Sequence, residues 1–141
     1  MPSPKAPAAL LYARSCYDHL AGELAVQLFD RLSEDGRIVV DLDEGTVLLT
    51  SSGESLFTEL GVDLDTARRA KRATLRPCLD WTQRRHHLAG SAAAGLLDAL
   101  FDRGWIVRGA AARSVELTER GRRGLTNTIG VDLAAVSSAV T

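Results

Sequence analysis

The sequence predicts an α+β fold, mostly helical, in which two tandem units each contain a long helix, a β-hairpin and a second helix. The first observation is an internal repeat of about 68 residues: residues 19–60 align without a gap with residues 87–128 and match at sixteen of forty-two positions. The tetrapeptide His19-Leu20-Ala21-Gly22 recurs as His87-Leu88-Ala89-Gly90. The second observation is that helical periodicity is followed, in both copies, by two short apolar runs. We therefore expect units at 11–73 and 74–141, after a disordered lead-in at 1–10.

In the first unit, apolar residues at helical spacing predict a long amphipathic helix over residues 16–32, begun by Ser15 and Asp18 and ended by Gly36. The β-branched runs 37–41 and 46–50 predict a hairpin. Ser51-Ser52 then predicts the cap of a helix that ends at Gly61, and a further helix is expected from Asp63 through the basic run that follows.

The second unit repeats this order, with a longer start. Cys78 precedes its His-Leu-Ala-Gly by nine residues, whereas Cys16 precedes the first copy by three. We expect the six additional residues to make the segment 78–86 helical. A long helix from Leu88 to about Arg103, a hairpin at 105–108 and 114–118, a helix at 119–125 and a short apolar helix from Val131 to Val140 are expected to follow.

Composition indicates a globular protein. The chain has 141 residues, of which 45% are hydrophobic and 25% charged, with a formal net charge of −1. This charge predicts no attraction of the whole molecule to nucleic acid or acidic membranes. The sequence has no membrane-spanning run and no signal peptide, so we expect a cytoplasmic protein with reduced thiols. It contains no phosphate-binding glycine loop and no nucleophile motif, so we expect no enzyme activity and no obligatory cofactor.

A helix ending in glycine, two strands, Leu-Thr-x-x-Gly and a second helix are similar to the second half of a winged helix, in which the long helix reads DNA and the hairpin is the wing. The motif occurs as Leu49 to Gly53 and as Leu117 to Gly121. The segments 14–22 and 78–90 resemble the C-terminal half of bacterial ArsR-type transcriptional regulators, over about Leu11 to Leu125. In those relatives an additional N-terminal helix-turn-helix domain reads DNA. The resemblance therefore implies that DNA binding depends on a domain that these 141 residues do not include.

Neither long helix has the chemistry of a recognition helix. The second presents Ala92, Ala93, Ala94 and Gly95, and the first presents Glu23 and Asp30, whose carboxylates repel phosphate. Small residues let another helix approach closely, so we expect these helices to pack against protein.

Basic residues gather elsewhere in the chain, and two roles fit them. They form either a strip that contacts DNA phosphates or a solvated helix face. The residues concerned are Arg68, Arg69, Lys71, Arg72, Arg76, Arg84 and Arg85.

A second set of side chains has the ligand types that transition metals accept, and both units begin with Cys-x-Asp. If pseudo-twofold packing brings the two starts together, thiols and imidazoles converge on one site for a metal or redox effector. The alternative is structural, with the aspartates capping helices and the cysteines filling core space. The candidates are Cys16, Asp18, His19, Cys78, Asp80, His86 and His87.

Three aromatic residues, Tyr17, Trp81 and Trp105, are the candidate walls of a pocket for an apolar small-molecule effector, or else ordinary core residues. Taken together, the sequence predicts the effector-sensing or dimerisation half of an ArsR-like regulator, assembled as a homodimer. The alternatives are a free-standing protein-interaction domain and, third, a direct DNA binder acting through Arg68 to Arg76.

Overall fold

The computed structural model describes residues 12–16 and 18–131, in which five helices alternate with four two-stranded antiparallel hairpins. The first half contains β1 (Arg14–Cys16), β2 (His19–Ala21), α2 (Glu23–Glu34), β3 (Ile38–Asp41), β4 (Thr46–Leu49), α3 (Ser51–Leu60) and α4 (Leu64–Arg69). The second half contains β5 (Arg76–Asp80), β6 (Arg85–Ala89), α5 (Ser91–Asp102), β7 (Ile106–Arg108), β8 (Val115–Leu117) and α6 (Glu119–Thr128). The order hairpin, helix, hairpin, helix therefore runs twice, and α4 is an addition to the first half. The expected lead-in at 1–10 lies outside the described residues, as does the expected C-terminal helix beyond Val131.

The first long helix begins later than the sequence predicted. Arg14–Cys16 and His19–Ala21 pair as the hairpin β1–β2, and the N-cap of α2 is Gly22 at φ 93°, without a side-chain cap. The prediction that Ser15 and Asp18 begin the helix is therefore wrong. Leu20 matched the helical spacing because it faces the same core from a strand, and periodicity does not distinguish these two ways of being buried.

The predicted helix over 78–86 is also wrong, because this segment belongs to the hairpin β5–β6. Arg76 to Asp80 pair with Arg85 to Ala89, and the additional residues form a longer turn. The long helix α5 then starts at Ser91 and not at Leu88, after Gly90 at φ 108°. The two strands contain no β-branched residue, so the residue types of the segment alone did not favour a hairpin over a helix.

The elements that follow each long helix agree with the prediction, apart from the cap of α3 and the end of α4. Thr50, and not Ser51 or Ser52, caps α3 by accepting a hydrogen bond from the Gly53 amide at 3.2 Å. Thr118 caps α6 in the same way, through the Gly121 amide at 2.9 Å. The hairpins β3–β4 and β7–β8 form as expected, whereas α4 ends at Arg69, before the rest of the basic run.

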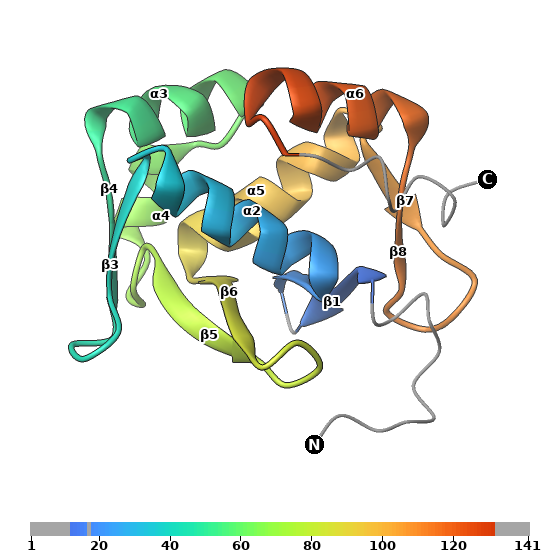
Figure 1. Ribbon diagram of the computed structural model, residues 1–141. Coiled ribbons are helices and arrows are strands. Elements are labelled where there is room, and N and C mark those ends of the chain that lie inside the picture. The colour runs from blue at the N-terminus through green and yellow to red at the C-terminus, as the bar shows by residue number, and fades with distance from the viewer. Residues whose placement is uncertain (1–11, 17, 132–141) are drawn as a thin grey trace.

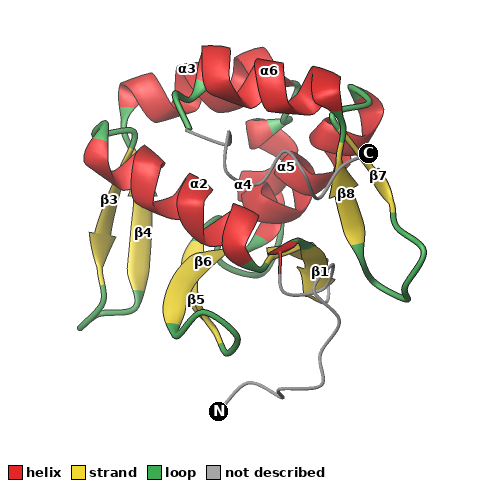
Figure 2. Ribbon diagram, turned by 45° about the vertical axis from the view of Figure 1, so that its right-hand side comes forward, coloured by secondary structure: helices red, strands yellow, loops and turns green. Residues whose placement is uncertain are grey.

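The two halves interlock. Helix α2 packs on β6 of the second half, α5 packs on β2 of the first half, and β2 contacts β6. Hairpin β1–β2 also joins the second half through the Arg14–Ser114 bridge and backbone hydrogen bonds from Ser15 to Arg113 and from Val115 to Ala13. In Figure 1, α2 and α5 cross at the centre, α3 and α6 lie along one edge, and the hairpins β3–β4 and β7–β8 flank them on opposite sides. The turned view in Figure 2 keeps this arrangement.

One apolar core extends through both halves, so the two units stabilise each other. Its members include Leu24 and Leu32 from α2, Phe57 from α3, and Leu100 from α5. The small residues Ala92 and Ala93 of α5 are buried in it, as the expectation of close packing against protein requires. Within the described residues, no helix is both long and apolar enough to cross a membrane.

Candidate functional site

Each of the hairpins β1–β2 and β5–β6 presents one thiol and one imidazole from directly opposed residues. Cys16 pairs with His19 in the first, and Cys78 pairs with His87 in the second. Opposed residues of an antiparallel pair project from the same face, so each hairpin offers its two ligand atoms together. Because β2 contacts β6, the two pairs meet where the first half contacts the second.

The resulting cluster is compact. The ligand atoms of Cys16, His19, Cys78 and His87 all lie within 4.8 Å of one another. The Nε2 atoms of the two histidines are 3.1 Å apart, and their ring centroids are 5.0 Å apart. Both histidines are buried, whereas both cysteines are partly exposed.

Asp80 is fully buried and contacts the Nδ1 side of the His87 ring, away from the cluster. One carboxylate oxygen lies 3.0 Å from His87 Nδ1 and accepts a hydrogen bond from the Gly22 amide at 2.6 Å. The other oxygen accepts hydrogen bonds from Arg14 at 3.2 Å and from the amides of Thr82 and Gln83. Burial alone would raise the pKa of Asp80, but the hydrogen bonds from His87 and Thr82 lead the contacts that hold it well below its ordinary value. The carboxylate is therefore ionised, and it accepts hydrogen bonds from both halves.

Asp18 holds His19 in the equivalent way but at the surface. Its carboxylate lies 3.3 Å from His19 Nδ1 and forms an ion pair with Arg72 at 2.6 Å. Partial burial opposes ionisation, yet the hydrogen bonds from Arg72 and His19 prevail and lower the pKa of Asp18. Both histidines thus have an ionised carboxylate at Nδ1.

The ionised carboxylates determine the tautomers of both histidines. An ionised carboxylate only accepts hydrogen bonds, so each Nδ1 carries a proton and donates it. In the neutral ring the lone pair then lies on Nε2. Burial lowers the pKa of His19, and the nearby His87 lowers it further. Burial likewise raises the pKa of the Cys78 thiol, and Cys16 adds to this effect.

Chemically, these four side chains form a transition-metal donor set of two sulfurs and two nitrogens. The carboxylates behind the imidazoles are the outer partners that orient metal-binding histidines in proteins. Of the candidate ligands, the structure brings Cys16, His19, Cys78 and His87 together, with Asp18 and Asp80 behind them. It does not bring in His86, which lies next to His87 on the strand and has its ring 6.4 Å from the ring of Phe29.

Sequence reasoning missed Arg14, Gly22 and Thr82, which complete the site. Arg14 is buried, pairs with Asp80 and lies over the ring of Trp81 at 5.1 Å. These contacts join residues 58 to 68 positions apart. No local pattern marks them. The usable signal was the Cys-x-Asp that precedes His-Leu-Ala-Gly in both copies, which makes Cys78, Asp80 and His87 equivalent to Cys16, Asp18 and His19 once the six additional residues are allowed for.

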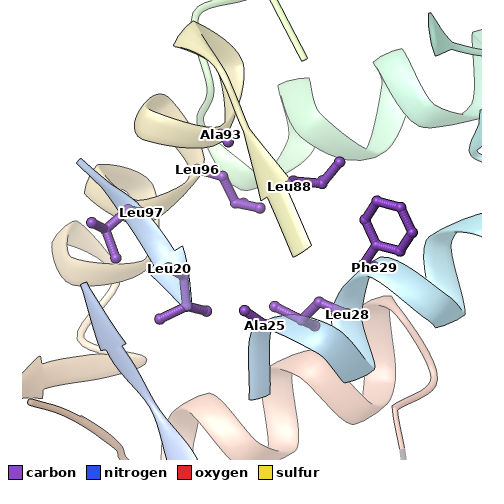
Figure 3. Close-up of a pocket in the computed structure, with 8 residues that line it drawn as sticks. All are labelled: Leu20, Ala25, Leu28, Phe29, Leu88, Ala93, Leu96 and Leu97. Atoms are coloured by element: carbon purple, nitrogen blue, oxygen red, sulfur yellow. The ribbon is translucent and has the colours of Figure 1, made fainter. Parts of the chain in front are cut away.

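The cavity between the long helices is not lined by the two tryptophans that the sequence suggested. It has a volume of about 20 Å³, which is room for about one water molecule. Trp81 and Trp105 are not among its lining residues, and Tyr17 lies outside the described residues. Figure 3 shows the side chains that converge on it from β2, α2, β6 and α5. The lining residues are four pairs related by the 68-residue spacing: Leu20 and Leu88, Ala25 and Ala93, Leu28 and Leu96, Phe29 and Leu97.

Three of the seven candidate phosphate contacts have carboxylate partners. Arg68 pairs with Glu54, Arg72 with Asp18, and Arg85 with Asp30. Of the others, Arg69 donates to the Thr66 hydroxyl at 3.3 Å. Ion pairing reduces the positive field that the strip offers to phosphate.

Comparison with known proteins identifies a regulator as a homologue. The chain is 40% identical over 114 residues to a Bacillus subtilis (strain 168) protein described as an uncharacterized HTH-type transcriptional regulator, YdfF. The match covers 80% of this chain and 49% of that protein, so the chain spans about half the length of the curated relative it matches. No family model matches the sequence, and no solved structure matches it. The chain is therefore related to an HTH-type transcriptional regulator.

Proposed function

We propose that this chain is the signal-receiving half of an ArsR-like transcriptional regulator, built from two tandem winged-helix-like units at 11–73 and 74–141. The observation that carries the proposal is the position of the cluster of Cys16, His19, Cys78 and His87. It lies where the two units meet, and each unit contributes half of its atoms. A group bound there contacts both units at once, so it changes their packing and not only its own surroundings.

The long helices support a receiving role over DNA reading. Helix α5 contains no basic residue, and Ala92 and Ala93 near its start pack in the core. Helix α2 begins with Glu23, whose carboxylate opposes contact with phosphate. We place the DNA contact of the regulator in a helix-turn-helix domain that belongs to the part of the relative not covered by this chain.

Two further parts of the proposal concern assembly and location. We expect a homodimer, because regulators with a helix-turn-helix bind paired half-sites through two-fold symmetry, and we expect it to act in the cytoplasm. Light scattering coupled to size-exclusion chromatography tests the first expectation. A monomer across the micromolar range would remove the dimer from the proposal.

Transcript measurements in the native host test the regulatory role. RNA levels are compared between wild type, a deletion of this gene, and strains that carry His19→Ala plus His87→Ala or His86→Ala. We expect the deletion to change the RNA levels of a small set of genes. The double variant should hold these RNA levels constant under all conditions, and His86→Ala should behave as wild type. Unchanged transcripts after deletion would favour the alternative, an interaction domain without a role at DNA.

Duplex binding by the chain itself addresses the third candidate. The expected result is weak binding that does not depend on sequence. Sequence-specific binding that falls steeply with salt, and is lost in Arg69→Ala plus Arg76→Ala, would instead place DNA recognition on the basic strip.

A further inference from the structure

The two buried imidazoles present an electrostatic problem. Asp18 and Asp80 keep Nδ1 of both rings protonated, so both Nε2 lone pairs point into the space where these atoms lie 3.1 Å apart. Two neutral acceptors in this arrangement repel each other and cannot form a hydrogen bond. The arrangement becomes favourable when a cation lies between the nitrogens.

A proton and a metal ion are the two cations to compare. A shared proton would join the two nitrogens but involve neither thiol, and it would add a positive charge that no thiolate offsets. A divalent metal displaces the protons of Cys16 and Cys78, and two thiolates neutralise its charge. The metal therefore uses all four side chains of the cluster and adds no net charge to them.

The spacing of the atoms also fits a metal. Tetrahedral zinc, with bonds of about 2.0–2.1 Å to nitrogen and about 2.3 Å to sulfur, places its two nitrogens about 3.3 Å apart and its two sulfurs about 3.8 Å apart. The two nitrogens here are 3.1 Å apart, and all four ligand atoms lie within 4.8 Å of one another. The nitrogen spacing is thus close to that of tetrahedral zinc, and the two sulfurs lie within reach of the same ion.

The donor set selects the metal class. Two thiolates and two imidazoles in a tetrahedron suit zinc, whereas magnesium and calcium require oxygen ligands. Each imidazole already has a carboxylate partner at Nδ1, which in metalloproteins orients the ring and raises its basicity. Arg14 has no direct access to the ion, because it is bound to Asp80.

We propose that Cys16, His19, Cys78 and His87 bind one Zn²⁺ ion, which joins hairpin β1–β2 of the first unit to hairpin β5–β6 of the second. Asp18 and Asp80 are positioning residues for the two histidines. Binding of the ion is independent of the proposed function, and only its role as the regulatory signal rests on that function. Because both hairpins pack on the long helices of the opposite unit, the ion fixes how the two units sit together.

Titration of the reduced, metal-free full chain with Co²⁺, followed by displacement with Zn²⁺, tests the proposal. We expect one Co²⁺ per chain, with the strong visible bands of a tetrahedral site and a thiolate-to-cobalt band in the near ultraviolet. Binding of Zn²⁺ near neutral pH should release about two protons, one from each thiol, and raise the melting temperature. Release of a third proton would indicate that a proton occupied the histidine pair before the metal.

The variants separate ligands from neighbours. Cys16→Ser and Cys78→Ser are each expected to abolish the thiolate-to-cobalt band or halve it, and His19→Ala to remove the tetrahedral spectrum. His86→Ala is the matched control, because His86 follows Arg85 on the same strand but lies outside the cluster, and its spectrum should equal that of wild type. Asp18→Asn should weaken Zn²⁺ binding by about 10- to 100-fold, as loss of an outer partner does.

Three results would overturn the metal site: no tetrahedral Co²⁺ spectrum, a spectrum that survives both cysteine variants, or a Cys16–Cys78 disulfide in protein isolated without oxygen. Each of them leaves the transcript experiment unaffected. Conversely, stoichiometric Zn²⁺ binding together with unchanged transcripts in the deletion strain would retain the site and remove the regulatory function.

Discussion

The two aspartate–histidine pairs occupy equivalent places in the repeat but lie in different environments. Asp80 is fully buried and accepts hydrogen bonds from both halves of the chain, including the Arg14 guanidinium and the Gly22 amide. Asp18 is 31% exposed and pairs with Arg72, which is itself 47% exposed. The duplication thus retained the contact to histidine in both copies, while the second copy also became a structural junction. Substitutions in the two copies should therefore differ in cost where the environments differ, and agree where they are the same.

Asp80→Ala should have the largest effect. It removes the partner of the buried Arg14 guanidinium and leaves the Gly22 amide without its acceptor, so we expect a loss of about 3–5 kcal/mol in the free energy of unfolding. Urea denaturation of metal-free protein measures it. Asp18→Ala is the matched control and should cost no more than about 1 kcal/mol. Equal losses for the two variants would contradict the assigned difference in environment.

Gly53→Ala and Gly121→Ala examine a place where the two copies are alike. A Cβ at Gly53 would overlap the carbonyl oxygen of Arg37, and one at Gly121 would overlap that of Trp105. Backbone cannot move aside as a flexible side chain does, so each variant should lose about 1–3 kcal/mol. The same denaturation experiment compares them. Gly36→Ala separates this overlap from backbone strain, because Gly36 has a positive φ of 71° but open space around its Cβ position.

The loss of stability in acid should be larger for the contribution of Asp80 than for that of Asp18. The pKa of each is lowered in the folded protein, so each contributes stability that is present above its unfolded pKa near 3.9 and is lost as the pH falls toward the folded pKa. Stability of metal-free wild type should therefore decrease below about pH 4. Asp80→Asn should remove more of this pH dependence than Asp18→Asn does, as measured by urea denaturation between pH 5 and pH 3. A steeper acid dependence in Asp80→Asn than in wild type would refute the assignment.

Arg72→Ala should have the smallest effect. Its ion pair with Asp18 is partly exposed, so the loss in the free energy of unfolding should be below about 1 kcal/mol and should decrease further in high salt. Arg68→Ala removes a comparable exposed pair with Glu54, away from the cluster, and is the control for a general charge effect. Only Arg72→Ala should also weaken Zn²⁺ binding, because only Arg72 contacts Asp18. A loss well above 1 kcal/mol would show that the Asp18 side is as structural as the Asp80 side.

The sequence by itself determined the parts of the fold that local chemistry specifies. The repeat predicted two copies of one element order, and the hairpins β3–β4 and β7–β8 followed from short β-branched runs between turn residues. The helices α3 and α6 were also predicted, α3 from a serine cap and the glycine that ends it, although the observed cap of α3 is Thr50. These features depend on contacts within a few residues, so their residue types identify them.

Only the tertiary structure decided where the hairpins β1–β2 and β5–β6 form and what they bring together. Leu20 and Leu88 are buried whether their segments are strand or helix, so the apolar pattern left both segments undecided. The strands become favourable because each packs on the long helix of the other unit, a contact between residues far apart in the chain. The cluster depends on the same packing between units. Cys16 and His19 alone are half of a donor set, and the contact between the two units places Cys78 and His87 opposite them.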